Sequence, residues 1–281
     1  GGATARSLAA LRPLLARLPL HVERHAPGLR LLADGERFAD PTPALLDPAQ
    51  WPVHEPVAGS GRGGAWFVAD RPCDGLEAQD AHAGSRGHAA VLRHYLRGGL
   101  LGRWLGDRHL HRGALAARPL AEYVLLRRMR AWGLEVPRPL AARVVRRGLV
   151  DRGDILVERI VGAANLATLL GRTPLERAAW DTVGTLIGRL HGCGVLHGDL
   201  NCHNLLLDAG GRAWVVDFDA SRIVTDGRAA AARDLARLRR SLRKQARLAT
   251  PCHWDEARDW PLLQQAHEAA FDAAVAGASS R

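Results

Sequence analysis

A run of polar residues in the second half of the chain has the residue types of a phosphoryl-transfer site. His197, Asp199 and Asn204 follow the spacing H-x-D-x-x-x-x-N, and Asp217 opens an Asp-Phe-Asp turn thirteen residues after Asn204. In such a set the first aspartate accepts or orients the proton of an acceptor hydroxyl, and the asparagine and second aspartate hold magnesium. We therefore predict Asp199 as the catalytic residue, His197 as its structural histidine, and Asn204 and Asp217 as Mg2+ ligands.

The residues around this set predict how it is positioned. Residues 205–207 and 214–216 are short apolar runs separated by a turn segment, 209–212, which is the pattern of a β-hairpin. A hairpin brings Asn204 and Asp217 to the same edge. The combination is typical of the catalytic loop and metal-binding turn of protein-kinase-like enzymes. We expect an α+β, two-lobed protein-kinase-like fold, with a small antiparallel β-sheet and one helix in the N-lobe and a mainly α-helical C-lobe.

Three glycines lie N-terminal to the catalytic loop, in kinase order. Gly59, Gly61 and Gly64 match G-x-G-x-x-G and precede a short apolar strand. Glycines allow backbone amides to approach phosphates because no side chain collides. Their position before a strand favours a kinase flap over ATP and disfavours a dinucleotide fold. We predict that they bind ATP; a glycine-rich hairpin without a ligand is the alternative.

A kinase flap is accompanied by a cation on a following strand. The strand expected over residues 89–95 offers Arg93 there, and the helix expected over residues 118–133 has Glu122 as its only acid. A guanidinium binds phosphate oxygens and carboxylates alike, so we predict an Arg93–Glu122 pair that serves ATP. The alternatives are a solvent-facing strand arginine and a glutamate paired within its own helix.

The rest of the chain is expected to divide into three parts. Residues 1–50 are predicted to be an N-terminal extension, made of a helix and a proline-rich connector. Residues 51–158 are predicted to form the N-lobe and residues 159–281 the C-lobe. Glu158 opens the expected hinge, where backbone groups contact the adenine edge of ATP.

The segment after the Asp-Phe-Asp turn bears on the acceptor. The chain has no A-P-E segment and enters an arginine-rich helix over about residues 228–248. Protein kinases carry that segment, so its absence favours a small-molecule or lipid-linked acceptor. In the helix, Asp234 either bonds to the catalytic-loop backbone or pairs with Arg237. The histidines and cysteines near the loop match no familiar zinc spacing.

Charge and composition limit the partners. The net charge is +10, and Lys244 is the only lysine among 39 basic residues. Codon bias in a GC-rich genome explains why arginine so outnumbers lysine. The positive net charge suits an anionic partner, and we expect that partner not to be a nucleic acid. The segment 97–112 combines arginines with leucine and tryptophan, so it is a candidate for contact with the acceptor and an anionic membrane surface, or a basic loop that packs between strand and helix.

The lack of recognisable targeting signals in this sequence, together with its cysteine usage, leads us to expect a cytoplasmic protein. The chain has no apolar run of about 18 residues that could span a bilayer. Residues 1–20 lack the apolar core of a signal peptide. The four cysteines show no C-x-x-C spacing, which favours reduced thiols.

Several phrases of this sequence resemble one family. HGDLNCHNLLLD, VVDFDASR, GRGGAWFV, VLRHYLRGGL and RDLARLRRSL, within residues 51–244, are similar to the bacterial lipopolysaccharide kinases that phosphorylate 3-deoxy-D-manno-octulosonic acid (Kdo), in the protein-kinase-like superfamily. That family likewise has arginine in place of the strand lysine, as at Arg93. The resemblance implies ATP-dependent phosphorylation of the 4-hydroxyl of Kdo on a lipid A precursor, by a peripheral protein at the cytoplasmic face of the inner membrane.

Other functions stay open at this point. One alternative is a related enzyme that uses the same ATP-binding residues but phosphorylates a heptose, an aminoglycoside or choline. An atypical protein kinase is disfavoured by the missing A-P-E segment. A non-catalytic basic scaffold that binds membrane or nucleic acid is disfavoured by the intact Asp199, Asn204 and Asp217.

Overall fold

The chain forms two compact units. The computed structural model describes residues 21–57, 64–70, 89–95, 118–147 and 150–279. The first unit comprises residues 1–128 and 138–159, and the second comprises residues 129–137 and 160–281. The N-lobe was expected to end at residue 158, and the second stretch of the first unit ends at residue 159. The segment 129–137, which falls within the expected N-lobe, belongs to the second unit.

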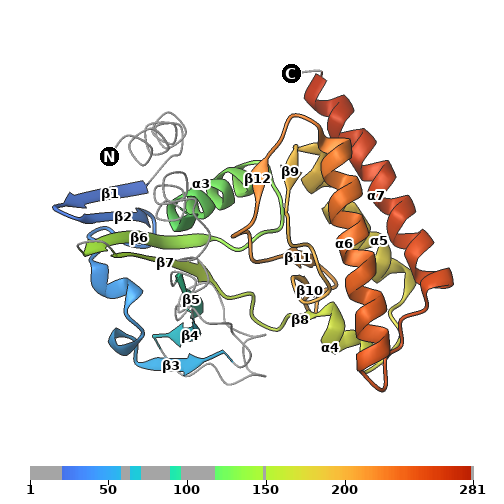
Figure 1. Cartoon of the computed structure of the whole chain (residues 1–281), viewed down its shortest axis with the longest axis horizontal. Coiled ribbons are helices and arrows are strands. Elements are labelled where there is room, and N and C mark those ends of the chain that lie inside the picture. Colours follow the sequence, from blue (N-terminus) through green and yellow to red (C-terminus); the bar gives the residue numbers. More distant parts are fainter. Residues whose placement is uncertain (1–20, 58–63, 71–88, 96–117, 148–149, 280–281) are drawn as a thin grey trace, which may run out of the picture. The chain divides into compact units, whose positions relative to one another are not determined.

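The first unit is built on a seven-stranded sheet in the order β1-β2-β6-β7-β5-β4-β3 (Figure 1). Each neighbouring pair is antiparallel. Its core is formed by fully buried leucines from several strands, including Leu31, Leu92 and Leu156. The strands are β1 (His21–Ala26), β2 (Leu29–Asp34), β3 (Val53–Pro56), β4 (Ala65–Ala69), β5 (Ala89–Tyr95), β6 (Pro139–Arg147) and β7 (Val150–Glu158).

Residues 21–50 belong to this sheet unit. β1 and β2 form a hairpin around Gly28, whose φ of 73° suits a tight turn, and β2 pairs with β6 along its length. Two short 3-10 turns follow, η1 (Pro43–Leu46) and η2 (Pro48–Gln50), and Leu46 is fully buried. The structure therefore differs from the expected separate extension, because β2 pairs with β6 and buries Leu31, Leu32 and Ala33 in the sheet. The helix expected within residues 1–20 lies outside the described residues.

Helix α3 (Arg118–Ala131) corresponds to the helix expected in the N-lobe. Pro119 stands at its start, where the missing amide costs no helical hydrogen bond. Tyr123 and Leu126 are buried, and the Arg127 guanidinium lies 3.3 Å from the carboxylate of Asp34 at the end of β2. The helix is thereby fixed to the sheet that carries Arg93.

The second unit is mainly helical, so the expected α+β class is confirmed. Asn165 and Asp226 cap α4 and α6 by accepting hydrogen bonds from Thr168 N and Ala229 N, each at 2.9 Å. The helices are α4 (Leu166–Leu170), α5 (Arg177–Gly192), α6 (Gly227–Leu248) and α7 (Glu256–Ser279). The strands β8 (Ala164–Asn165), β10 (Leu205–Leu207) and β11 (Ala213–Val215) form one small sheet, and β9 (Val195–Leu196) and β12 (Arg222–Ile223) form another.

Helices α5 and α7 run side by side at very close approach (Figure 1). A Cβ on Gly184 would lie 2.3 Å from the carbonyl oxygen of Leu263, and one on Gly188 would lie 2.3 Å from that of His267. Residues four apart share one helix face, so these glycines admit the backbone of α7. No helix among the described residues is long and apolar enough to cross a membrane.

Gly188→Ala should lower the free energy of unfolding by about 1–3 kcal/mol, because the added methyl overpacks the α5–α7 contact. Gly277→Ala is the matched control, since a Cβ on this α7 residue meets nothing within 4 Å. The control should be neutral or slightly stabilising, as alanine favours helix by up to about 1 kcal/mol over glycine. Urea unfolding of both variants tests this, and equal stabilities would contradict the packing argument.

Candidate active site

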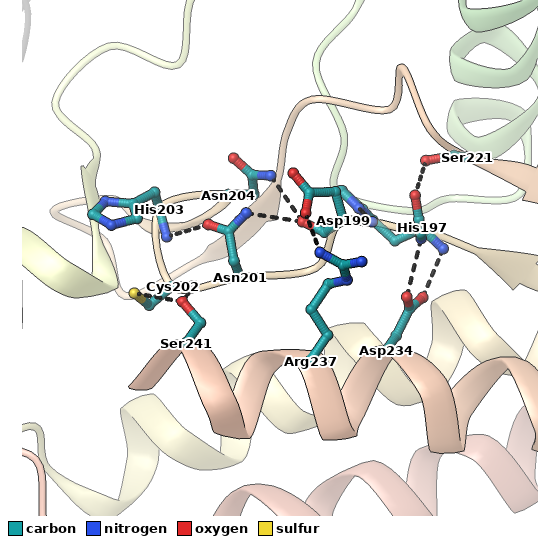
Figure 2. Close-up of polar contacts among 11 residues, drawn as sticks. His197, Asp199, Asn201, Cys202, His203, Asn204, Ser221, Asp234, Arg237 and Ser241 are labelled. Carbon is teal, nitrogen blue, oxygen red and sulfur yellow. Dashed lines mark hydrogen bonds and ion pairs between the residues drawn. The ribbon is translucent and has the colours of Figure 1, made fainter. Parts of the chain in front are cut away.

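The catalytic loop, residues 197–204, lies along one face of α6 (Figure 2). Asp234 accepts hydrogen bonds from the amides of His197 at 2.6 Å and Gly198 at 3.0 Å. One heptad further on, the Ser241 hydroxyl accepts from the amide of Cys202 at 3.2 Å. Positions seven apart lie on the same side of a helix, so α6 supports both the beginning and the middle of the loop. Of the two alternatives for Asp234, bonding to the loop backbone is correct.

Gly198 occupies the position that is arginine in the H-R-D form of this motif. Its φ is +81°, and a Cβ there would lie 2.6 Å from the carbonyl oxygen of Ala220. A side chain at this position would therefore collide with the turn that follows Asp217. The loop has no cation of its own beside Asp199.

His197 links the loop to the Asp-Phe-Asp turn. Its Nε2 donates to the carbonyl of Val216 at 3.0 Å, and its Nδ1 accepts from the amide of Asp199 at 3.3 Å. Burial lowers the pKa of His197, so the ring is neutral, which fits one donor and one acceptor nitrogen. Its centroid lies 4.9 Å from that of Phe218. These contacts match the structural role predicted for His197.

Asp199 presents its carboxylate to solvent from a fixed backbone. Its side chain is 48% exposed, and Oδ1 accepts from Nη1 of Arg237 at 2.8 Å. Its carbonyl oxygen accepts from the side-chain amides of Asn201 at 2.9 Å and Asn204 at 3.0 Å (Figure 2). The position suits a group that must reach the hydroxyl of an incoming acceptor.

Asn204 and Asp217 come together as the hairpin pattern predicted. The carbonyl of Asn204 accepts from the amide of Val216, which immediately precedes Asp217, at 3.0 Å. Among the described residues, Asp217 is the one non-glycine with positive φ, at 67°. That conformation costs about 1–3 kcal/mol and persists only where the surroundings impose it, as at functional sites.

The two residues fit a magnesium ion held partly by its substrate. The amide nitrogen of Asn204 is committed to Asp199, so its oxygen is the atom left for a cation. Carboxylate and amide oxygens are hard ligands, and Mg2+ typically takes one or two carboxylates together with phosphate oxygens. Within the described part of the chain, no three His, Cys, Asp or Glu side chains are grouped to hold a metal. The donor set therefore suits Mg2+ bound with a nucleotide.

A buried chain of polar groups lies behind the loop. His191 Nε2 lies 3.3 Å from Asp234 Oδ2, and its Nδ1 lies 2.9 Å from Nε2 of His267 on α7. Burial alone would raise the pKa of Asp234, but hydrogen bonds from His191 and the loop amides outweigh it and hold the pKa below its usual value. Burial and the neighbouring His191 lower the pKa of His267 to about 4.

The ion pair expected in the first unit is present. Arg93 on β5 donates to Oε1 of Glu122 on α3, and Glu122 is 3% exposed. Tyr95, two residues along the same strand, donates its hydroxyl to the other carboxylate oxygen. Alternate residues of a strand share one face, so β5 offers both donors to one carboxylate. That the Arg93–Glu122 pair takes part in ATP binding stays a prediction.

The predicted glycine flap is only partly described, and the segment predicted to contact the acceptor is not described. Gly59 and Gly61 lie outside the described residues; Gly64 has a φ of 71°, and its carbonyl accepts from the amide of His94 at 3.1 Å. The segment 97–112 also lies outside the described residues.

Glu158 lies at the end of β7. Its amide donates to the carbonyl of Arg138 at 2.8 Å, and its carboxylate lies 3.5 Å from the guanidinium of Arg37. These contacts belong to the sheet, so the contact of its backbone with adenine stays a prediction.

The contact of Arg237 with Asp199 and the roles of Ser241, Tyr95 and His267 were not foreseen from the sequence. One signal was available for α6: polar residues at 234, 237 and 241 follow the i, i+3, i+7 spacing of a single helix face. His267 offered no comparable signal, since its partner is 76 residues away.

An exposed aspartate on such a loop, and an Arg–Glu pair that joins a strand of an antiparallel sheet to a helix, define a kinase-type phosphotransferase. Comparison with known families agrees: the model of the lipopolysaccharide kinase (Kdo/WaaP) family matches residues 51–266. The chain belongs to this family.

Several curated proteins are similar over most of the chain. A 3-deoxy-D-manno-octulosonic acid kinase of Vibrio vulnificus (strain YJ016) is 36% identical over 241 residues, covering 85% of this chain and 94% of that protein. One from Stenotrophomonas maltophilia (strain R551-3) is 40% identical over 246 residues, covering 86% and 90%. One from Xanthomonas axonopodis pv. citri (strain 306) is 39% identical over 245 residues, with the same coverage.

The buried His267 should make the fold acid-sensitive. Because the pKa of His267 is about 4 in the folded protein and 6.5 ordinarily, the unfolded chain takes up a proton first as the pH falls. The stability of the folded state is therefore complete above about pH 6.5 and declines down to about pH 4, by up to about 3 kcal/mol.

His267→Gln should show a smaller decline over this pH range, measured by thermal or urea unfolding. His203→Gln is the control, because His203 is exposed and should leave the profile unchanged. If His267→Gln kept the full decline, the acid sensitivity would have to arise elsewhere.

Proposed function

We propose that this chain transfers the terminal phosphoryl group of ATP to the 4-hydroxyl of a Kdo residue on a lipid A precursor, in lipopolysaccharide inner-core biosynthesis. The observation that carries the proposal is the exposed carboxylate of Asp199, fixed by its backbone within an H-x-D-x-x-x-x-N loop. Membership in the lipopolysaccharide kinase family and relatives named for Kdo support this acceptor.

The second unit supplies the residues that act on the transferred group. Asp199 accepts or orients the proton of the acceptor hydroxyl, which brings the oxygen into line for attack. Asn204 and Asp217 hold Mg2+, which when bound neutralises the charge on the phosphate oxygens. His197 fixes the distance between loop and turn by bonding to both.

The first unit supplies groups for the nucleotide. Arg93 binds phosphate oxygens in addition to Glu122, since a guanidinium has five donors. Burial of Glu122 keeps the guanidinium in one orientation, which reduces the entropy lost on binding. Gly59, Gly61 and Gly64 cover the phosphates with backbone amides, and the backbone at Glu158 contacts the adenine.

The acceptor is a lipid, so the protein acts in peripheral contact with the cytoplasmic face of the inner membrane. The net charge of +10 favours an anionic surface by about 1 kcal/mol for each basic residue close to it. Sedimentation with anionic vesicles should show binding that weakens with salt, whereas neutral vesicles should bind little. Binding that ignored both salt and anionic lipid would contradict the membrane contact.

Transfer from labelled ATP to a Kdo-bearing lipid A precursor tests the function. The same assay should include heptose, aminoglycoside and choline acceptors, with and without Mg2+. We expect Mg2+-dependent labelling of the Kdo acceptor, at the 4-hydroxyl by NMR of the product. Preference for another acceptor would overturn the proposal while leaving the kinase chemistry in place.

Asp199→Asn should lower kcat by about 10²–10⁴-fold, because the amide cannot accept the hydroxyl proton. ATP binding, measured by titration calorimetry, should remain. Asp181→Asn removes the same charge from a partly exposed position on α5 and should leave kcat unchanged. Normal turnover by the Asp199 variant would remove this residue from the reaction.

Arg93→Ala should raise the KM for ATP about 10- to 100-fold, the usual loss for hydrogen bonds between charged groups. The KM for the acceptor should change little. Arg152→Ala, at an exposed position on β7, should leave both constants unchanged. An unaltered KM for ATP in the Arg93 variant would show that the Arg93–Glu122 pair is structural only.

A further inference from the structure

Arg237 of α6 supplies the positive charge that the catalytic loop lacks. Its Nη1 donates to Oδ1 of Asp199 at 2.8 Å, and both side chains are about half exposed, at 47% and 48%. Figure 2 shows the guanidinium pointing from the helix toward the carboxylate, one turn beyond Asp234. Because Gly198 excludes a side chain from the loop itself, the cation beside the catalytic carboxylate comes from the helix.

Arg237 is part of a line of bases, here called the basic stripe. The stripe consists of Arg233, Arg237, Arg240 and Lys244, all exposed and spaced by four, three and four residues. Such spacing places side chains on one helix face. That face adjoins the one formed by Asp234 and Ser241, which holds the catalytic loop, so the stripe flanks the loop along its length.

Three of the four other arginines of α6 pair with carboxylates of α7, and the fourth is Arg247 in its last turn. Arg239 and Arg243 both contact Glu256, and Arg228 contacts Asp272 on α7. No carboxylate in the described part of the chain pairs with the remaining three stripe members, Arg233, Arg240 and Lys244. Three arginines of α6 are therefore paired with carboxylates of α7, whereas Arg233, Arg240 and Lys244 of the basic stripe are not.

The contact between Arg237 and Asp199 leaves the guanidinium able to bind a second anion. A half-exposed ion pair contributes only about 0–1 kcal/mol, and this one uses one of the five guanidinium donors. The donors left over can bind a second carboxylate in the two-pronged geometry that arginine favours. Arg237 can thus keep its contact with Asp199 and bind an anionic ligand at the same time.

The position of the acceptor follows from this geometry. A hydroxyl that gives its proton to Asp199 must lie within about 2.6–3.2 Å of the carboxylate. Any group close to that hydroxyl on the acceptor then lies beside Arg237. In Kdo the carboxylate and the 4-hydroxyl are carried by the same ring, so a hydroxyl that meets Asp199 brings a carboxylate into the neighbourhood of Arg237.

We propose that Arg237 is an acceptor-binding residue that selects a sugar acid by binding its carboxylate, and that Arg233, Arg240 and Lys244 extend this surface toward further anionic groups of the same acceptor. The inference rests on the proposed function for the identity of the sugar. It goes further by assigning acceptor specificity to α6 rather than to the catalytic loop.

Paired acceptors test the role of Arg237. Wild type and Arg237→Gln are assayed with the Kdo acceptor and with its C1 carboxamide, which keeps the ring and hydroxyl but loses the charge. The variant should raise the KM for the acid about 10- to 100-fold and leave the KM for the amide within about twofold. The KM for ATP should not change; any effect on kcat should be common to both acceptors, since Asp199 is shared.

Arg228→Gln is the matched control. It removes the same charge from the same helix, but from a residue that contacts Asp272, and it should leave the acid-to-amide ratio of KM values at the wild-type figure. Thermal unfolding of each variant checks the fold, and Arg237→Lys, which keeps the charge without the fork, should give an intermediate KM for the acid.

A second comparison separates the carboxylate from lipid A phosphates. The triple variant R233Q/R240Q/K244Q should raise the KM for the phosphorylated lipid-linked acceptor but not for its dephosphorylated form. Arg237→Gln should raise both, because both carry the sugar carboxylate. If Arg237→Gln discriminated phosphorylated from dephosphorylated acceptors instead, the carboxylate assignment would be overturned.

The outcomes also separate this inference from the proposed function. Equal KM changes for acid and amide would overturn the role of Arg237 while wild-type transfer to Kdo upheld the function. Absence of wild-type transfer to Kdo would overturn the function. In that case calorimetric binding of free Kdo and its carboxamide still decides the inference, since loss of acid binding alone in Arg237→Gln supports it and unchanged binding refutes it.

Discussion

The catalytic loop depends on one buried carboxylate. Asp234 is 1% exposed, and its two oxygens accept from the amides of His197 and Gly198 and from His191. Burying a charge without partners costs several kcal/mol, and each amide left without an acceptor costs about 1–3 kcal/mol. The Asp234 carboxylate and the loop amides therefore depend on each other for hydrogen bonds, because the buried carboxylate has no water to replace them. This mutual requirement gives the loop one position on α6.

The loop in turn positions the metal-binding turn. His197 is neutral because it is buried, and a neutral imidazole has one donor and one acceptor, which it directs to Val216 and Asp199. Ser221 adds a hydrogen bond from its hydroxyl to the carbonyl of His197 at 2.8 Å. The strained φ of Asp217 persists because these contacts and the hairpin fix the chain on both sides.

Sequence reasoning succeeded where the chemistry is local. The spacing of Asp199 and Asn204 and the hairpin leading to Asp217 are set by neighbouring residues, and the structure brings them together. The Arg93–Glu122 pair was also predictable, since a strand cation and a helix acid recur in this class. The hairpin over residues 21–34 was missed because proline-rich sequence follows it, which favoured a connector. Contacts of Arg237 and His267 depend on how α6 and α7 pack, which no local pattern encodes.

Helix α6 therefore both holds the catalytic loop and positions the exposed Arg237. Asp234 and Arg237 lie one turn apart on α6, so the buried contact that fixes the loop also fixes the distance between the Asp199 carboxylate and an exposed guanidinium. Arg237 is carried by a helix that packs against α5, so its position depends on the helix packing and not on the conformation of the loop. Preorganisation of this kind lowers the entropy lost when a ligand binds. Because Gly198 places no charge beside Asp199, differences in acceptor among proteins with this loop can arise from the exposed face of the supporting helix without altering the residues that transfer the phosphoryl group.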